Sequence, residues 1–228
     1  MEGVSQFNDD DKITSGEQQG RPFIFFVEGT DDELFLNAVL TELGASLDEI
    51  GIIKFQGIPK CGEVLEDFTK AGPFRQATTK TILIIFDADE DALVNQEKIN
   101  SHLERLGQPR IEIGKFIDNS DGVRIGMFSL PSSTHPGSLE TLCLSTATRP
   151  DLSMQADAFI NIAQEKMRGL GKGLNGSLDK RKAQAYIAAT AVDLCRGVGQ
   201  AFKQGSVFDK HHAALVPLKN FIQEGLKK

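Results

Sequence analysis

Two runs of apolar, β-forming residues, each followed directly by acidic residues, constrain the fold of this chain most. The first run covers residues 23–27 and leads into Glu28, and the second covers residues 81–86 and leads into Asp87 and Asp89. Both runs are continuously apolar, which is typical of strands buried on both faces of a parallel sheet. Open sheets of this kind bind ligands at the carboxyl ends of their strands. If the two strands are neighbours, at least three carboxylates meet at one edge of the sheet.

Carboxylates gathered at one edge repel one another unless a cation lies among them. Oxygen ligands with room for water suit Mg²⁺ or Mn²⁺. Asp87 and Asp89 face the same way if the strand geometry continues through Ala88, so we expect them to hold one ion together. Glu28, Asp87 and Asp89 are therefore expected to share a pocket and to have raised pKa values in the metal-free protein.

The pattern along the chain alternates strands with helices and then becomes helical. Residues 1–20 lack apolar periodicity and are expected to form a disordered tail, residues 21–145 an α/β domain, and residues 150–228 a helical extension. The predicted strands are 22–27, 50–55, 81–86 and 123–130. The predicted helices are 31–43, 61–70, 92–106, 136–144, 154–167, 178–195 and 213–226, with a linker at 145–153. The alternation favours a parallel sheet of about four strands with helices on its faces.

The helix predicted at 31–43 has a recognisable start and end. Thr30 and Glu33 have the spacing of a capping box, and Gly44 is placed to end the helix. Asp32 lies in the first turn, where a helix dipole stabilises an acid without any function. The pattern alone therefore leaves open whether Asp32 is a ligand or only a favourable helix residue.

Composition and charge limit the classes of protein. The chain has 228 residues, of which 40% are hydrophobic and 25% charged, as in an ordinary globular protein. No apolar run approaches the roughly 20 residues of a membrane span, and the N-terminus has no apolar signal segment, so a cytoplasmic location is expected. The cysteines Cys61, Cys143 and Cys195 are too widely spaced for a zinc site or a disulfide framework.

Basic residues are concentrated in one part of an otherwise acidic chain. The formal net charge of −7 argues against indiscriminate nucleic-acid binding. The segment 166–182 is nevertheless strongly basic, which is compatible with local phosphate binding. The candidates for nucleic-acid contact are Lys172, Lys180, Arg181 and Lys182, and we expect their segment to fold back over the strand ends. The glycine-rich stretch before them fits no nucleotide motif and is interpreted as a loop.

The acidic motifs resemble those of the Toprim domain. Val27-Glu28-Gly29-x-x-Asp32, followed by Asp87-x-Asp89 after an apolar strand, is similar to the motif order in topoisomerases, DnaG-type primases, recombination mediators and OLD-type nucleases. A longer likeness, over residues 130–144, 180–186 and 209–218, resembles a stand-alone Toprim-containing family that is grouped near the OLD-type nucleases.

This resemblance implies a Toprim-like α/β sheet and Mg²⁺- or Mn²⁺-dependent hydrolysis of phosphodiester bonds in DNA or RNA. The metal ligands that it implies are Glu28, Asp32, Asp87, Asp89 and Glu140. Glu28 would also serve as a general base, and Lys182 is the candidate for a late catalytic lysine, although its neighbours in 180–182 fit the motif as well. Glu140 is equally compatible with an exposed helix acid.

Departures from the family narrow the expected activity. No Gly-x-x-x-x-Gly-Lys-Ser/Thr motif occurs, so any ATPase would be a separate partner. The only tyrosine, Tyr186, lies in a predicted helix, which disfavours a topoisomerase, and three cysteines cannot form a four-cysteine zinc site. Two alternatives remain: a non-catalytic Toprim-fold module that binds nucleic acid or protein, and a phosphatase that uses the Asp-x-Asp pair.

Overall fold

The computed structural model describes residues 20–70, 78–132, 134–171, 177–191 and 197–227. The tail predicted for residues 1–20 falls almost wholly outside the described residues, as do Lys172, most of the glycine-rich stretch, Cys195 and the end of the helix predicted at 178–195. Cys61 and Cys143 are buried free thiols.

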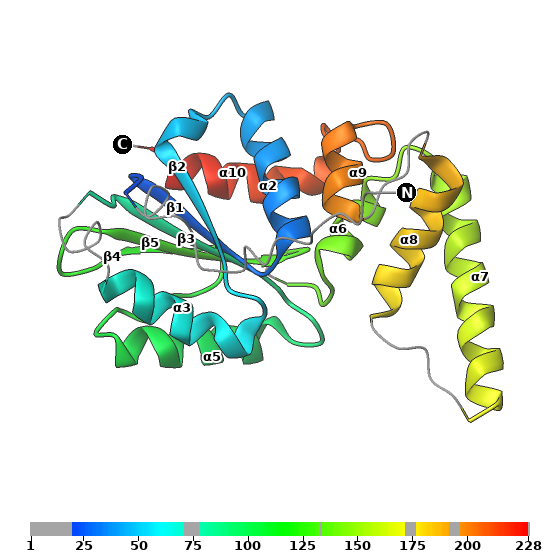
Figure 1. Ribbon diagram of the computed structural model, residues 1–228, viewed down its shortest axis with the longest axis horizontal. Coiled ribbons are helices and arrows are strands. Elements are labelled where there is room, and N and C mark those ends of the chain that lie inside the picture. The colour runs from blue at the N-terminus through cyan, green and yellow to red at the C-terminus, as the bar shows by residue number, and fades with distance from the viewer. Residues whose placement is uncertain (1–19, 71–77, 133, 172–176, 192–196, 228) are drawn as a thin grey trace, which may run out of the picture.

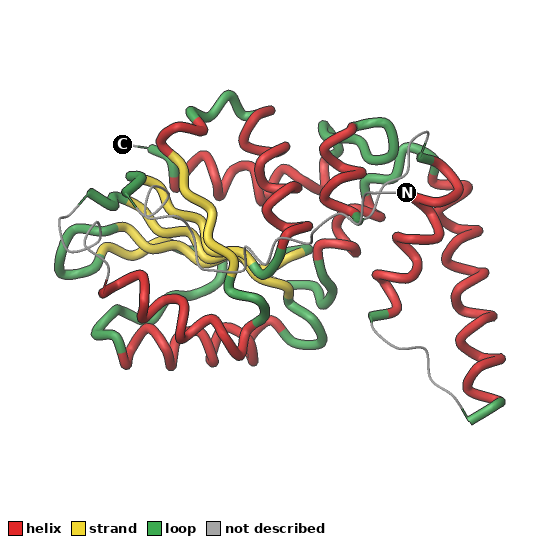
Figure 2. Tube along the Cα trace, in the orientation of Figure 1, coloured by secondary structure: helices red, strands yellow, loops and turns green. Residues whose placement is uncertain are grey.

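A mostly parallel sheet forms the centre of the molecule (Figures 1 and 2). Its strands, in spatial order, are β2 (Ile50–Lys54), β1 (Phe23–Val27), β3 (Thr81–Asp87), β5 (Arg124–Leu130) and β4 (Phe116–Asp118). The first four are parallel, and β4 pairs with β5 in the antiparallel direction at one edge. Both apolar runs identified in the sequence form neighbouring central strands, because β1 pairs directly with β3.

Helices cover both faces of this sheet. α3 (Ile58–Lys70) and α5 (Ala92–Arg105) lie on one face, and α2 (Thr30–Glu42) and α10 (Val216–Gly225) lie on the other (Figure 1). Alternate residues of β1 separate the two cores: Ile24 and Phe26 pack with α3 and α5, whereas Phe25 packs with α2 and α10. The strands are therefore continuously apolar because both of their faces are covered.

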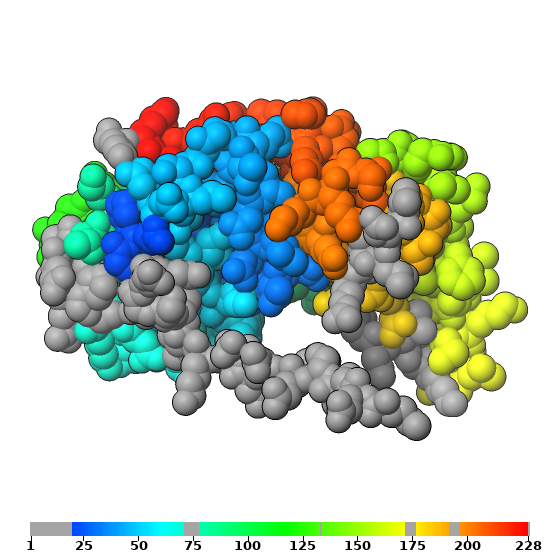
Figure 3. All heavy atoms as spheres, turned by 45° about the horizontal axis from the view of Figure 1, so that its top comes forward, coloured from blue at the N-terminus to red at the C-terminus, as the bar shows by residue number. Residues whose placement is uncertain are grey.

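The remaining helices follow β5 along the chain, and two 3₁₀ turns, η1 (Leu47–Glu49) and η2 (Ala213–Leu215), directly precede β2 and α10. The helices are α6 (Leu139–Ser145), α7 (Pro150–Gly169), α8 (Leu178–Thr190) and α9 (Val198–Gln204). α9 packs against α2 so closely that a Cβ on Gly199 would lie 2.0 Å from the carbonyl oxygen of Asp31. Figure 3 shows the two helices pressed together, α9 in orange and α2 in blue. The C-terminal helices thus share the core of the α/β domain through α9 and α10.

The predicted fold class, an α/β parallel sheet flanked by helices with further helices at the C-terminal end, is confirmed. The prediction of about four strands missed β4, because its three residues are largely exposed and carry no apolar run. The predicted linker at 145–153 is too long, since α7 already starts at Pro150, a residue suited to the first turn of a helix. The short helix α9 was also missed. No helix in the described ranges is both long and apolar enough to cross a membrane.

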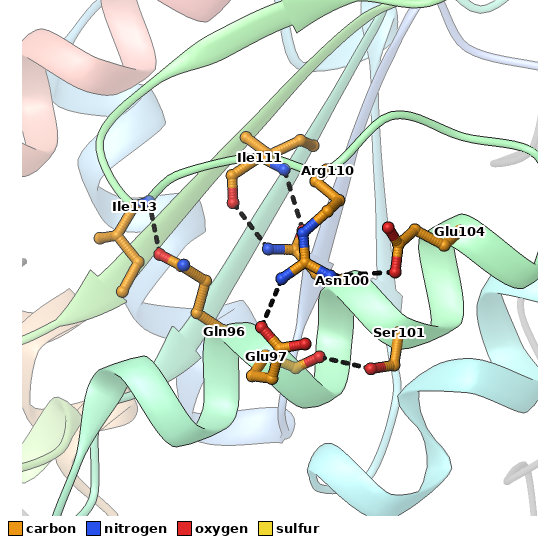
Figure 4. A network of polar contacts seen from close by, with 8 residues as sticks. All are labelled: Gln96, Glu97, Asn100, Ser101, Glu104, Arg110, Ile111 and Ile113. Carbon is orange, nitrogen blue, oxygen red and sulfur yellow. Dashed lines mark hydrogen bonds and ion pairs between the residues drawn. The ribbon is translucent and has the colours of Figure 1, made fainter.

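A polar network fixes the irregular segment between α5 and β4 (Figure 4). The buried Asn100 side chain exchanges two hydrogen bonds with the backbone of Ile111, at 3.0 and 2.9 Å. The Gln96 side chain accepts a hydrogen bond from the Ile113 N–H at 3.0 Å. Arg110 pairs with Glu104 at 2.9 Å and also with Glu97. These side chains on α5 satisfy backbone groups that have no strand partner, which holds the approach to β4 in place.

Replacing Phe221 by Ala tests whether α10 belongs to the core. The Phe221 ring stacks on Phe116 at 4.6 Å and contacts Phe128 at 5.1 Å between ring centroids. We expect this change to lower the free energy of unfolding by about 3 kcal/mol, because it leaves a cavity between α10 and the sheet. The exposed Val216 of the same helix is the matched control, and Val216→Ala should cost less than about 1 kcal/mol. Equal denaturant midpoints for the two variants would contradict the packing described here.

Candidate acidic site

The two acidic motifs meet at the carboxyl ends of β1 and β3. The backbone N–H of Asp87 donates a hydrogen bond to Glu28 Oε1 at 2.9 Å. This contact joins residues at the ends of two parallel strands whose pairing runs from Phe23 opposite Thr81 to Phe26 opposite Ile84. The predicted adjacency of the two strand ends is therefore confirmed.

Asp87 in turn ties α6 to the end of β3. Its Oδ1 accepts a hydrogen bond from the backbone N–H of Leu139 at 2.9 Å. Leu139 is the first residue of α6, so the carboxylate of Asp87 lies at the positive end of this short helix. Glu140, the next residue, is held at the same end, where its Oε2 accepts a hydrogen bond from Ser138 Oγ at 2.8 Å.

Asp32 caps α2 and also faces the other carboxylates. Its Oδ2 accepts a hydrogen bond from the Gly29 N–H at 3.0 Å, and Gly29 is the N-cap residue. The predicted capping box of Thr30 and Glu33 is therefore wrong by one position, since Gly29 and Asp32 form it. Glu33 instead pairs with Lys54 at 3.1 Å. The second oxygen of Asp32, Oδ1, is buried and has no hydrogen-bond partner.

Asp89 is positioned by a turn rather than by the strand. β3 ends at Asp87, and Asp89 has a φ of +52°, a left-handed conformation that is uncommon for a residue other than glycine. Its backbone N–H and C=O both pair with Gly137 at 2.8 Å. Gly137 has a φ of +131°, and a Cβ there would lie 2.5 Å from Thr141 Oγ1, so this partner position requires glycine. The condition that strand geometry continues past Asp87 is not met.

Asn95 supports the Asp87–Asp89 segment and was missed in the sequence. Its buried side-chain amide donates to the carbonyl oxygen of Asp87 at 3.1 Å and lies 3.3 Å from Asp89 Oδ2. Lys98 Nζ donates to Asn95 Oδ1 at 3.2 Å. Helical periodicity could have revealed Asn95. It lies on the same face of α5 as the buried Ile99 and Leu103, where an apolar residue is expected.

Burial and mutual repulsion raise the pKa values of three of the acids. Burial is the main cause for each of them. The pKa of Asp32 rises to about 7, with further contributions from the charges of Glu28 and Glu140. The pKa of Asp87 lies well above its usual range, because the charges of Asp32, Glu28 and Glu140 add to its burial. The pKa of Glu28 is raised by burial and by the charges of Asp89 and Glu140. The predicted rise in carboxylate pKa is found for Glu28 and Asp87, and Asp32 shares it.

The carboxylates of this site suit a hard divalent cation, but they are not already arranged as a metal site. Within the described part of the chain, no group of three acidic, histidine or cysteine side chains has the geometry of a metal site. Glu28, Asp32 and Asp87 each use one oxygen on a backbone N–H and keep the other, and Asp32 Oδ1 is an orphaned acceptor. Carboxylate oxygens of this kind suit Mg²⁺ or Mn²⁺.

A cavity of about 630 Å³ opens beside this cluster, at the start of α5, α6 and α8. Its lining is mostly acidic and polar, and consists of Asp89, Glu90, Asp91, Val94, Asn95, Lys98, Gly137, Ser138, Ser177, Leu178 and Asp179. Thr141 Oγ1 donates to Asp179 Oδ2 at 2.5 Å, which anchors the first turn of α8 to α6. The basic segment therefore starts on the same side of the sheet as Asp87, as expected.

The predicted basic residues differ in their exposure and surroundings. Lys180 is exposed in the first turn of α8, and Arg181 is partly exposed. Lys182 pairs with Asp157 of α7, with 2.5 Å between Nζ and Oδ1, and its side chain is only 17% exposed. It faces a second hollow together with Thr141 and Asp179 rather than the carboxylates themselves. The cation that does line the main cavity is Lys98, for which the charge pattern gave no signal.

Comparison with known proteins identifies a family and a distant structural likeness. The sequence profile of a family described as "Protein of unknown function (DUF3226)" matches residues 22–227. No curated protein matches the sequence. Among solved structures, the chain is similar to the C-terminal region of the Burkholderia pseudomallei OLD protein, with 17% sequence identity and a TM-score of 0.43, over 91% of this chain and 99% of that chain. At this level of similarity the likeness carries no argument about mechanism.

The raised pKa of Asp32 predicts a specific dependence of stability on pH. Because its pKa rises from 3.8 to about 7 on folding, the metal-free folded protein binds a proton that the unfolded chain releases. The free energy of unfolding should therefore be highest near pH 3.8 and should fall as the pH rises to about 7. Asp32→Asn should flatten the decline, as measured by chemical unfolding at a series of pH values in the presence of a chelator. Glu63→Gln, at an exposed acid of α3, is the control, and equal slopes for both variants would contradict the assignment.

Proposed function

We propose that this chain, which belongs to the DUF3226 family, binds Mg²⁺ or Mn²⁺ and hydrolyses phosphodiester bonds of nucleic acid. The proposal rests on the acidic site itself and not on the family. One observation carries this proposal: Glu28, Asp32 and Asp87 converge with raised pKa values, and Asp32 Oδ1 is buried without a partner. Such an arrangement is unfavourable unless a cation or protons neutralise it. Clusters of this kind are concentrated at functional sites.

The residues that would hold the metal are Glu28, Asp32, Asp87, Asp89 and Glu140. Backbone N–H groups hold the carboxylates of Glu28, Asp32 and Asp87, and the side chains of Asn95 and Ser138 hold those of Asp89 and Glu140, so an ion would have to draw these groups closer together. A divalent ion held there would supply an activated water and would neutralise charge on the phosphate. Asn95 keeps the Asp87–Asp89 segment in place by donating to it from α5.

We propose Glu28 as the residue that accepts a proton, in line with the motif resemblance. Burial raises its pKa, which brings it closer to neutral pH, where a general base works most efficiently. Its Oε1 is engaged by the Asp87 N–H, and this contact orients the second oxygen. The cavity wall formed by α5 and the start of α8 would receive the substrate. Lys98 in this wall and the exposed Lys180 nearby in the first turn of α8 would offset part of the repulsion between phosphate and an acidic protein.

The nucleic-acid substrate rests on the motif resemblance and on the cavity beside the acidic cluster. We include both DNA and RNA in the proposal, and we propose that any ATPase that acts with this chain is a separate protein. A non-catalytic module is the second candidate, and one observation favours it. Lys182, the candidate catalytic lysine, is engaged by Asp157, so it would have to leave this ion pair to reach a phosphate.

Hydrolysis should depend on Asp87 and on a divalent ion. We expect the purified protein to cleave single-stranded or plasmid DNA, or RNA, with Mn²⁺ or Mg²⁺ but not with a chelator. Asp87→Asn keeps the size of the side chain but weakens its hold on a cation, so its rate should fall by about 100-fold or more. Glu63→Gln changes an exposed acid of α3 outside the acidic cavity and should stay within about threefold of wild type. Cleavage at equal rates by Asp87→Asn would exclude the site, whereas metal binding without any cleavage would favour the non-catalytic module.

A pair of variants separates a catalytic role of Lys182 from a structural one. Lys182→Met removes the ammonium group, whereas Asp157→Asn removes only its partner and frees Lys182. If Lys182 contacts the substrate, Lys182→Met should lose activity and Asp157→Asn should keep it, with thermal stabilisation by Mn²⁺ intact in both. If the ion pair only joins α7 to α8, both variants should instead lose thermal stability to a similar extent and keep comparable activity. The second result would remove Lys182 from the proposed mechanism.

A further inference from the structure

Among the described elements α7 packs mainly on α8, and it lies at one end of the molecule (Figure 1). Ala156 and Ile160 are its buried residues. Three large apolar side chains on the helix are exposed: Met154 by 73%, Phe159 by 64% and Ile162 by 56%. Exposed apolar residues that occur singly need no explanation, but several on one helix suggest a contact surface.

Six exposed side chains between Asp151 and Lys166 form one continuous stripe, whereas the exposed Met154 and Glu165 lie outside it. A helix turns by about 100° per residue, so residues separated by three, four, seven or eight positions share a face. By this rule six residues lie within an arc of about 100°, away from the α8 side. They are Asp151, Gln155, Ala158, Phe159, Ile162 and Lys166. Asp157, which pairs with Lys182 beside the acidic site, lies on nearly the opposite side of the helix.

This stripe is complementary to its own reversed copy. If a second α7 runs antiparallel so that position 151 faces position 166, position 158 faces position 159 and position 155 faces position 162. The exposed Asp151 carboxylate, which also pairs with Arg149 of its own chain at 3.3 Å, then meets the Lys166 ammonium twice, once in each direction. At the axis Phe159 lies beside Phe159 of the second copy, because a twofold axis keeps equivalent residues on the same side, and Ile162 packs over the stem of Gln155. Reversal also places the two helix dipoles antiparallel.

We propose that the stripe on α7 is the interface of a homodimer in which two copies of this helix pack antiparallel about a twofold axis between Ala158 and Phe159. A second copy fits because each end of the stripe carries the charge that the opposite end needs. Copies that each carry a net charge of −7 repel overall, so a locally matched contact is required to bring them together. The dimer leaves the acidic cavity of each copy open, since that cavity lies on the α8 side.

The expected affinity is modest. A helix of 20 residues is about 30 Å long, so two such helices bury an area near the lower end of that found in specific interfaces. We therefore expect a dissociation constant of about 1–10 µM and reversible association.

Sedimentation of the full chain at concentrations of about 1–100 µM tests the dimer directly. Wild type should shift from monomer to dimer over this range. Phe159→Asp should stay monomeric with an unchanged melting temperature, because the side chain is exposed in the monomer. Leu47→Asp, at an exposed apolar residue of η1, is the control and should dimerise like wild type. A monomeric wild type, or a dimer that survives Phe159→Asp, overturns the proposal.

A charge swap tests the antiparallel register. Asp151→Lys alone and Lys166→Asp alone each create two like-charge contacts per dimer, so each should weaken association by about tenfold or more. A mixture of the two variants forms a heterodimer in which every contact pairs opposite charges, and association should return to the wild-type level. The same restoration is expected when both changes are made in one chain. If neither the mixture nor the double variant regains wild-type association, this register is wrong. If the two single variants, the mixture and the double variant all associate like wild type, the interface itself is wrong.

Discussion

The hydrogen bond from the Asp87 N–H to Glu28 Oε1 is the contact on which the site depends. It exists because β1 and β3 are parallel neighbours, and their pairing requires the continuous apolar runs that are buried between two layers of helices. Asp87 then holds the start of α6 through Leu139, and α6 holds the start of α8 through Thr141 and Asp179. Loss of the strand pairing would therefore separate the acids and release both later helices.

The same arrangement works against the stability of the metal-free protein. Burial and like charges raise the pKa values of Glu28, Asp32 and Asp87, so ionising them in the folded state is unfavourable. Three backbone N–H groups offset part of this cost, and Asp32 Oδ1 has no such partner. A cation that binds the folded state stabilises it by mass action, which couples occupancy of the site to the stability of the fold.

The sequence predicted those parts of the structure that depend on the residues of a single helix or strand. The apolar runs predicted the central strands and the meeting of Glu28 with Asp87, because burial on both faces leaves a direct mark on composition. β4 was missed because it is stabilised by pairing with β5 and by the Phe116–Phe221 stack rather than by its own pattern. The bond from Asn95 to Asp87 and the pairing of Lys182 with Asp157 join residues on different elements, and neither leaves a signal in charge or periodicity that identifies the partner.

Proton release on metal binding tests the central claim most directly. Calorimetric titration of Mn²⁺ or Mg²⁺ in buffers with different ionisation enthalpies measures how many protons leave the protein as the ion binds. Because the pKa of Asp32 is about 7 and those of Glu28 and Asp87 are also raised, binding near pH 6 should release about one proton or more per ion, and Asp32→Asn should release fewer. Binding with no proton release, or the absence of binding by the wild-type protein, would contradict the assignment of these carboxylates as a cation site.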